Sequence, residues 1–204
     1  MQFDRPFRVI TSAVDGDILS VLARAEHEFT IADLARKITS RSAEGIRLAM
    51  DRLIEQGVIS IRQVGPSRAF SLNRDHLSAP AIVALAELPE TFHALLAEEI
   101  GRWQEQPHYV ALFGSAARGE MRPGSDIDIA LVRLGDSTDL WAAQVKTLIS
   151  RITVWTGNDT RPIEFSKAEV MGAAHTDGVI RDILRDGITI VGDRGDFRAL
   201  VGAP

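Results

Sequence analysis

Two short segments of the sequence carry side chains that could do chemistry on a phosphorylated ligand. Gly114 and Ser115 directly follow the apolar run 108–113, and Asp126 and Asp128 open a second apolar run. Glycine lets a ligand approach the backbone, and a strand that passes into a helix presents backbone N–H groups to phosphate oxygens. Because side chains alternate across a strand, carboxylates at i and i+2 point to one face.

The carboxylate pair predicts a bound cation. Two carboxylates on one face repel each other unless a positive charge lies between them. Oxygen ligands of this kind suit Mg²⁺ or Mn²⁺, which bind a few carboxylates together with the phosphates of a substrate. The combined pattern therefore predicts chemistry on a complex of a divalent cation with a nucleotide.

The elements that would position these residues are those of a small α/β domain. A helical pattern at 140–155 separates the acidic strand from a strand-like run at 161–166, which fits a β–α–β connection. Further along, a short helix over 179–184 ends at Gly187 and precedes a last strand, 188–191. Residues 193–204 are expected to be a loose end.

The motif Gly114-Ser115-x-x-Arg118-Gly119, followed by Ser125-Asp126-x-Asp128, resembles the signature of the polymerase-β-type nucleotidyltransferase superfamily, and its small bacterial "minimal" members most closely. The likeness spans residues 108–132. It implies a mixed sheet flanked by helices, with Asp126 and Asp128 as catalytic residues that bind Mg²⁺ or Mn²⁺. It also implies nucleotide binding by Gly114, Ser115, Arg118 and Ser125.

The resemblance further implies a third carboxylate on a neighbouring strand. Glu164 is the best candidate, because Ile163 and Phe165 are expected to face the core and Glu164 the other way. It would bind metal and act as general base. The alternative is an exposed strand residue paired with Arg161. Asp159 is the reserve candidate, although its context at 157–159 is typical of a turn.

The N-terminal third has a different pattern. Apolar spacing predicts helices at 12–25, 31–38 and 46–54, and two strands at 58–64 and 68–73 follow. This order resembles the winged helix-turn-helix family over roughly residues 12–74, in which the third helix enters the major groove and the wing contacts phosphate. The resemblance implies DNA contacts by Arg41, Ser42, Arg47, Arg62 and Arg68.

Residues 41–74 hold six arginines and three acids, so this strip predicts modest, strongly salt-dependent DNA affinity. Two other interpretations stay open. The arginines could merely solvate an exposed face, with Asp51 pairing to Arg47, or the domain could dock a protein or form a dimer.

Composition and charge fit two modules in one α/β (α+β) chain. The 204 residues carry a net charge of −5, but residues 1–78 have a net charge of +1 and the remainder −6. We expect a winged helix domain over 1–78, connector helices over 79–104, a nucleotidyltransferase domain over 105–193 and a C-terminal tail over 194–204. The apolar stripe of the connector predicts a packing helix or a dimer seam.

Several classes of protein are excluded or disfavoured. Without cysteine there is no disulfide, thiolate metal site or cysteine nucleophile. The P-loop, dinucleotide-binding and serine-hydrolase motifs are missing, and the five histidines lack metal-binding spacing. No apolar run reaches bilayer length and the N-terminus does not resemble a signal peptide, which predicts a soluble, cytoplasmic protein without a membrane partner.

The leading hypothesis is a nucleotidyltransferase that moves NMP from an NTP, ATP by preference, to a hydroxyl acceptor by a two-metal mechanism. By resemblance, the acceptor is a partner protein, as in toxin–antitoxin pairs, a transfer RNA or a small molecule. The alternative is a winged-helix DNA-binding transcriptional regulator whose nucleotidyltransferase-like domain senses nucleotide or is inactive.

Overall fold

The computed structural model describes residues 1–171, 173 and 177–203, which form two compact units. The N-terminal unit comprises Arg5–Pro89, and the C-terminal unit comprises Met1–Asp4 with Glu90–Pro204. This division differs from the one expected, because residues 79–104 do not form a separate connector. Their first helix packs in the core of one unit and most of their second in the core of the other.

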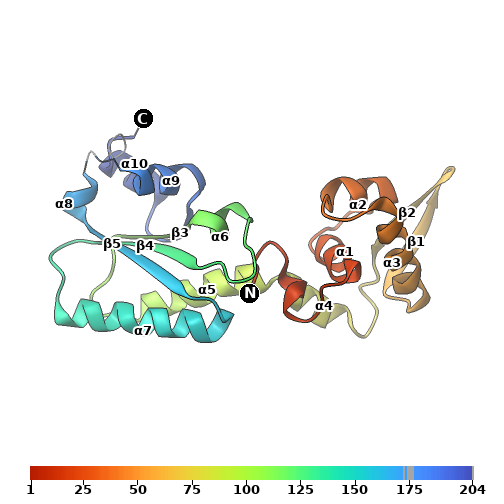
Figure 1. Ribbon diagram of the computed structural model, residues 1–204, viewed down its shortest axis with the longest axis horizontal. Helices are drawn as coiled ribbons and strands as arrows, with labels where there is room; N and C mark the ends of the chain where they lie inside the picture. The colour runs from red at the N-terminus through yellow and green to blue at the C-terminus, as the bar shows by residue number, and fades with distance from the viewer. Residues whose placement is uncertain (172, 174–176, 204) are drawn as a thin grey trace. The chain divides into compact units, whose positions relative to one another are not determined.

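The N-terminal unit consists of short helices and one hairpin (Figure 1). Its hairpin is antiparallel and pairs Ile59 with Leu72, while Phe29 forms an isolated bridge with Phe70. In chain order its helices and strands are η1 (Pro6–Val9), α1 (Val14–Ala23), α2 (Ile31–Lys37), α3 (Ala43–Glu55), β1 (Ile59–Val64), β2 (Ser67–Leu72) and α4 (Ala79–Ala86). From α1 to β2 they occur in the predicted order, and the short helix η1 before them was not predicted.

The caps of α2 and α3 explain where these helices begin. The Thr30 side chain accepts a hydrogen bond from the Asp33 amide, and the Asp33 carboxylate accepts one from the Thr30 amide, so the two residues form a capping box. The Ser42 hydroxyl accepts one from the Gly45 amide at the start of α3. These bonds satisfy amides that have no partner within the helix.

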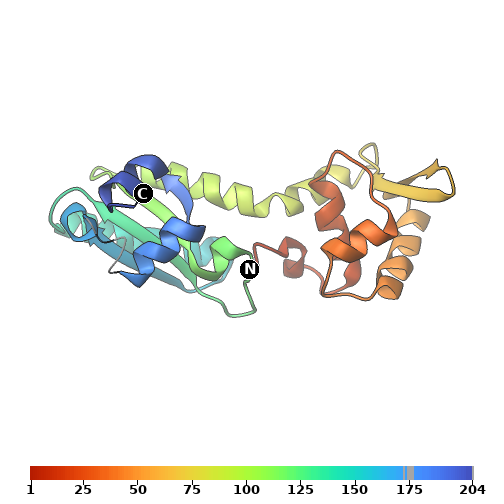
Figure 2. The same cartoon turned by 90° about the horizontal axis from the view of Figure 1, so that it is seen from above.

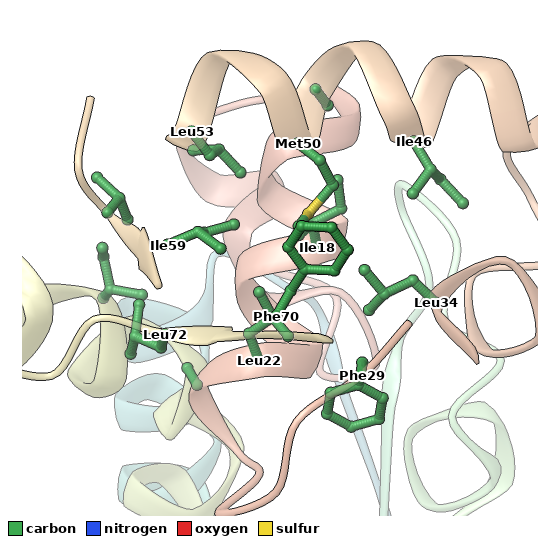
Figure 3. Close-up of a cluster of buried hydrophobic side chains, with 14 of the residues drawn as sticks. Ile18, Leu22, Phe29, Leu34, Ile46, Met50, Leu53, Ile59, Phe70 and Leu72 are labelled. Atoms are coloured by element: carbon green, nitrogen blue, oxygen red, sulfur yellow. The ribbon is translucent and has the colours of Figure 1, made fainter. Parts of the chain in front are cut away.

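Apolar side chains from three helices and the hairpin meet in the core of the N-terminal unit (Figure 3). Ile18 of α1, Leu34 of α2, Met50 of α3 and Phe70 of β2 are almost fully buried there. Helix α4 adds further apolar side chains to the same cluster. Residues 79–86 are therefore part of this unit's core, because their apolar face packs against α1.

The C-terminal unit is built on a four-stranded mixed sheet, as expected. The strands β3 (Tyr109–Phe113), β4 (Ile127–Arg133), β5 (Thr160–Ser166) and β6 (Ile188–Val191) lie in the order β5-β4-β3-β6. Strand β3 is antiparallel to β4 and β6, and β4 is parallel to β5. Strand β5 forms one edge of the sheet and contains Pro162.

Helices cover both faces of this sheet (Figures 1 and 2). Helices α5 (Leu88–Gly101) and α7 (Asp139–Thr156) pack against Ile127, Ile129 and Leu131 of β4. Ala130 and Val132 of β4 pack instead with the layer formed by α8 (Lys167–Val170), α9 (Gly178–Asp186) and α10 (Arg194–Leu200). The short helix α6 (Gly114–Arg118) follows directly after β3.

The C-terminal segment is not the loose end that was expected. Residues 194–200 form α10, and Phe197 is buried and stacks on Tyr109 with ring centroids 4.2 Å apart. The Asp193 side chain caps the helix by accepting a hydrogen bond from the Asp196 amide. One aromatic residue in a short polar segment produces too weak a periodic signal for the sequence to indicate this packing.

No single helix among the described residues is both long and apolar enough to cross a membrane, although α4 and α5 taken together pass the test of length and composition.

Candidate functional site

Gly114 and Asp128 meet at the end of β3. Phe113, the last residue of β3, pairs with Asp128 in the antiparallel ladder, so Gly114 follows directly beside that carboxylate. Gly114 has φ +67°, and a Cβ at this position would overlap Oδ2 of Asp128 and lie 3.1 Å from its Cγ. Glycine is therefore needed both for the left-handed backbone and for the space that the carboxylate occupies.

Asp128 lies in β4, and Asp126 lies just before the start of that strand. Asp128 alternates with the buried Ile127 and Ile129, and so shares the face of Ala130. Burial raises the pKa of Asp128, and the negative charge of Asp126 also raises it. The positive charges of Arg161 and Arg118 lower it. Burial is the largest of these effects, so the pKa of Asp128 lies above its ordinary value.

The residue opposite Asp128 on the neighbouring strand is Arg161. The parallel register pairs Asp128 with Arg161 and Ala130 with Ile163, so Arg161 lies on the face of Asp128. Its Nη2 atom lies 2.7 Å from Oδ2 of Asp126. The Arg161 side chain is 71% exposed and that of Asp126 is 22% exposed, so the arginine is in contact with solvent while the aspartate is mostly covered.

Glu164 lies on the other face. It pairs with Leu131 in the register, and its Oε2 accepts a hydrogen bond from Nε1 of Trp141 on α7 at 2.5 Å. The expected convergence of Glu164 with the two aspartates is therefore not found. The expected alternation within β5 is present, and Glu164 is exposed, as in the alternative interpretation. Its partner is Trp141 of α7, whereas Arg161 pairs with Asp126.

Two of the remaining predicted nucleotide-binding residues, Ser115 and Arg118, lie in the helix that begins at Gly114, and the third, Ser125, lies in the turn before β4. Ser115 is half-buried in α6, and Arg118 at its end donates to Glu120 at 2.9 Å and lies 3.9 Å from Asp186. The Ser125 hydroxyl accepts a hydrogen bond from the Arg122 amide at 2.8 Å. Ser125 thus closes the turn that leads into the acidic strand.

Two residues that the sequence analysis did not assign to the site help to build it. Arg161, which was named only as a possible partner of Glu164, is one. Asn158 is the other: it is 5% exposed and donates a hydrogen bond to the Ser125 carbonyl at 2.8 Å, fixing the segment just before Asp126. The reserve candidate Asp159 contributes its carbonyl, which accepts a hydrogen bond from the Ile127 amide at 2.8 Å. The sequence does not give the register of β5 against β4, and this register decides which β5 residue lies opposite Asp128.

The donor set fits one divalent cation better than two. Mg²⁺ is commonly bound by one or two carboxylates together with substrate phosphates, and Asp126 and Asp128 supply such a pair. Over residues 1–171, 173 and 177–203, no cluster of three or more acidic or histidine side chains is arranged to hold a metal ion. The neighbouring strand presents a guanidinium to the aspartates, and this group cannot ligate a cation.

In the N-terminal unit, most of the predicted DNA-contacting residues are engaged within the protein. Arg41 donates to Asp17 at 2.8 Å and to the Ser12 carbonyl at 2.6 Å, and Ser42 is the cap of α3. Arg47 pairs with Glu44 rather than with Asp51, and Arg62 pairs with Glu28. These pairs neutralise much of the local positive charge that the sequence displays.

Arg68 differs from these residues. It is exposed at the start of β2, and the described part of the chain offers it no ion-pair partner. Arg68 and Arg47 both line a cavity of about 410 Å³ between α2, α3 and β2, together with Thr30, Met50 and Phe70.

Comparisons with known proteins bear on the C-terminal unit. Among solved structures, a toxin–antitoxin crystallised with AMP-PNP is 14% identical with a TM-score of 0.41, over 54% of this chain and 81% of that one. A mutant of the toxin–antitoxin MntA–HpeT with two aspartates replaced by glutamate is 13% identical with a TM-score of 0.42, over 54% of this chain and 81% of that one. A mutant of MntA–HpeT with a tyrosine replaced by alanine is 17% identical with a TM-score of 0.38, over 55% of this chain and 79% of that one. No curated protein matches. Residues 97–193 match the family model of the polymerase beta nucleotidyltransferase domain, so this part of the chain is a nucleotidyltransferase-type domain.

Proposed function

We propose that the C-terminal unit binds a nucleoside triphosphate, ATP by preference, with a divalent cation. It transfers the NMP group to a hydroxyl acceptor, and pyrophosphate and the hydroxyl proton are released. The observation that carries the proposal is the placement of Asp128 against Gly114, with Asp126 two residues before it in the chain, within a segment that matches the nucleotidyltransferase model. The missing side chain at Gly114 leaves room for the carboxylate next to the backbone that a phosphate would approach.

Each residue has a role in this proposal. Asp126 and Asp128 would hold Mg²⁺ or Mn²⁺, and Gly114, Ser115 and Arg118 would contact the phosphates. When bound, the cation would supply positive charge that offsets the charge developing on the phosphates. Glu164 is left out of the chemistry, because it hydrogen-bonds to Trp141 on the opposite face. Positioning and charge neutralisation would then provide most of the rate enhancement.

The double variant Asp126→Asn and Asp128→Asn tests the proposal. It removes both negative charges with little change of shape, so we expect transfer of label from α-³²P NTPs to fall by at least about hundredfold. Circular dichroism would show whether the fold is retained. Asp136→Asn is the matched control, since Asp136 is exposed in the loop after β4. Undiminished transfer by the double variant would falsify the assignment.

The chemical class of the acceptor is open to direct measurement. Incubating the full-length protein with a cell lysate and each of the four α-³²P NTPs would label a protein, an RNA or a small molecule. Nuclease and protease treatment of the product distinguishes these classes. The double aspartate variant serves as the blank, so that labelling by other enzymes in the lysate is subtracted.

A second proposal concerns the N-terminal unit, which we infer to be a winged helix that binds DNA. Arg68 and Arg47 support it, since both are exposed and lie on the surface shared by α3 and β2. We expect Arg47→Gln with Arg68→Gln to weaken a gel shift with the protein's own promoter DNA by about tenfold, and Arg36→Gln, an exposed arginine on α2, to leave it unchanged.

This gel shift also separates an enzyme from a regulator when it is run beside a pyrophosphate-release assay. Specific DNA binding without turnover on any acceptor would favour the regulator. Turnover without DNA binding at moderate salt would mean that the N-terminal unit docks a protein instead.

A further inference from the structure

Arg161 lies on the strand next to Asp128 and contacts Asp126. It stands opposite Asp128 in the β4–β5 register and forms an ion pair with Asp126 at 2.7 Å. The next two β5 residues on that face are Ile163 and Phe165, which pack against the core and offer no ligand atoms. A positively charged group therefore stands where a further carboxylate would be needed to hold a second cation.

The ion pair makes Arg161 a competitor of any cation that approaches Asp126. A guanidinium is always charged at accessible pH, and it already neutralises one of the two carboxylates. A divalent ion that arrives alone meets this charge and must displace it. The same guanidinium suits phosphate oxygens, which it can bind through two parallel hydrogen bonds.

We propose that Arg161 makes cation binding depend on the nucleotide, and that the site takes one divalent cation for each nucleoside triphosphate. The triphosphate gives the guanidinium a new partner, and Asp126 is then released to the cation. The exposed position of Arg161 leaves its head group room to move between the two partners. This inference rests on the proposed function, since it concerns the same site and the same ligand.

Equilibrium dialysis of the full-length protein tests the inference without any turnover. The probes are Mn²⁺ alone, and Mn²⁺ with the α,β-methylene analogues of the four NTPs, in which the bond to be cleaved is replaced. Metal and nucleotide are assayed in both compartments, which gives both affinity and stoichiometry. The variants are Arg161→Gln and, as matched control, Arg102→Gln, which removes an exposed arginine from an ion pair with Glu98 on α5.

We expect the wild-type protein to bind Mn²⁺ alone weakly and to bind one Mn²⁺ with each nucleotide analogue. Arg161→Gln removes the competing charge, so it should bind Mn²⁺ alone about tenfold more tightly than the wild type does. The nucleotide analogue should then increase the affinity for Mn²⁺ by a smaller factor than it does in the wild type. Arg161→Lys retains the charge and loses the paired hydrogen bonds, so it should keep the weak binding of Mn²⁺ alone but bind the Mn²⁺–nucleotide complex less tightly. Arg102→Gln should match the wild type in every measurement.

Two results would overturn the inference and leave the proposed function standing. One is equal affinity of the wild type and Arg161→Gln for Mn²⁺ alone, and the other is two Mn²⁺ ions bound per nucleotide. Two other results would contradict the proposed function itself. Either the wild type binds no Mn²⁺–nucleotide complex, or the double aspartate variant binds it as well as the wild type does.

Discussion

Replacing Gly114 by alanine is expected to reduce nucleotidyl transfer by about hundredfold while the protein stays folded. The new Cβ would overlap Oδ2 of Asp128 and force that carboxylate away from its position. Displacing a reacting group by about 1 Å is enough for a loss of this size. The backbone at φ +67° would add a strain of about 1–2 kcal/mol, which lowers stability without unfolding the unit. Label transfer and a urea denaturation curve measure the two effects separately.

Gly124→Ala is the control for this prediction. Gly124 has φ +81°, so alanine suffers the same kind of backbone strain, but a Cβ there would meet no atom within 4 Å. The two variants should therefore lose similar stability, and only Gly114→Ala should lose transfer. Equal activity of the two variants would show that contact with Asp128 is not what makes Gly114 necessary.

Truncation of Phe197 to alanine is expected to destabilise the C-terminal unit by about 3 kcal/mol. Phe197 is almost fully buried and stacks on Tyr109 of β3 with an interplanar angle of 3°. Its removal leaves a cavity against the central strands and detaches α10 from the sheet. All three tryptophans lie between residues 103 and 155, so their fluorescence reports urea unfolding of this unit.

The exposed Val154 on α7 supplies a matched control for Phe197. Its side chain is 80% exposed, so Val154→Ala should change the free energy of unfolding by no more than about 0.5 kcal/mol. If Phe197→Ala were as stable as Val154→Ala, the docking of α10 described above would be incorrect.

Much of the local structure could be predicted from the sequence, because its signals are local. Thr30 and Ser42 are residue types that favour N-caps, and they stand where α2 and α3 begin. The alternation within β4 places Asp128 on the face opposite to Ile127 and Ile129. The mixed α+β class also followed from the order of the elements.

The third position of the site could not be predicted, because it depends on a pairing between distant strands. A shift of one residue in the register of β5 would exchange the faces of Arg161 and Glu164. The sequence favours Glu164 because acids are the expected ligands, whereas the register brings Arg161 to the aspartates. Likewise, Arg41 looks like a DNA contact in the sequence, yet in the fold it neutralises Asp17.

Pro162 has a consequence for how copies of this protein meet. It lies in β5, at the free edge of the sheet, and it has no N–H to donate. A strand from a second molecule would find a donor missing there and a charged guanidinium beside it, two features that oppose edge-to-edge aggregation. The edge of the sheet that carries Arg161 is thereby protected against pairing with a strand of another chain.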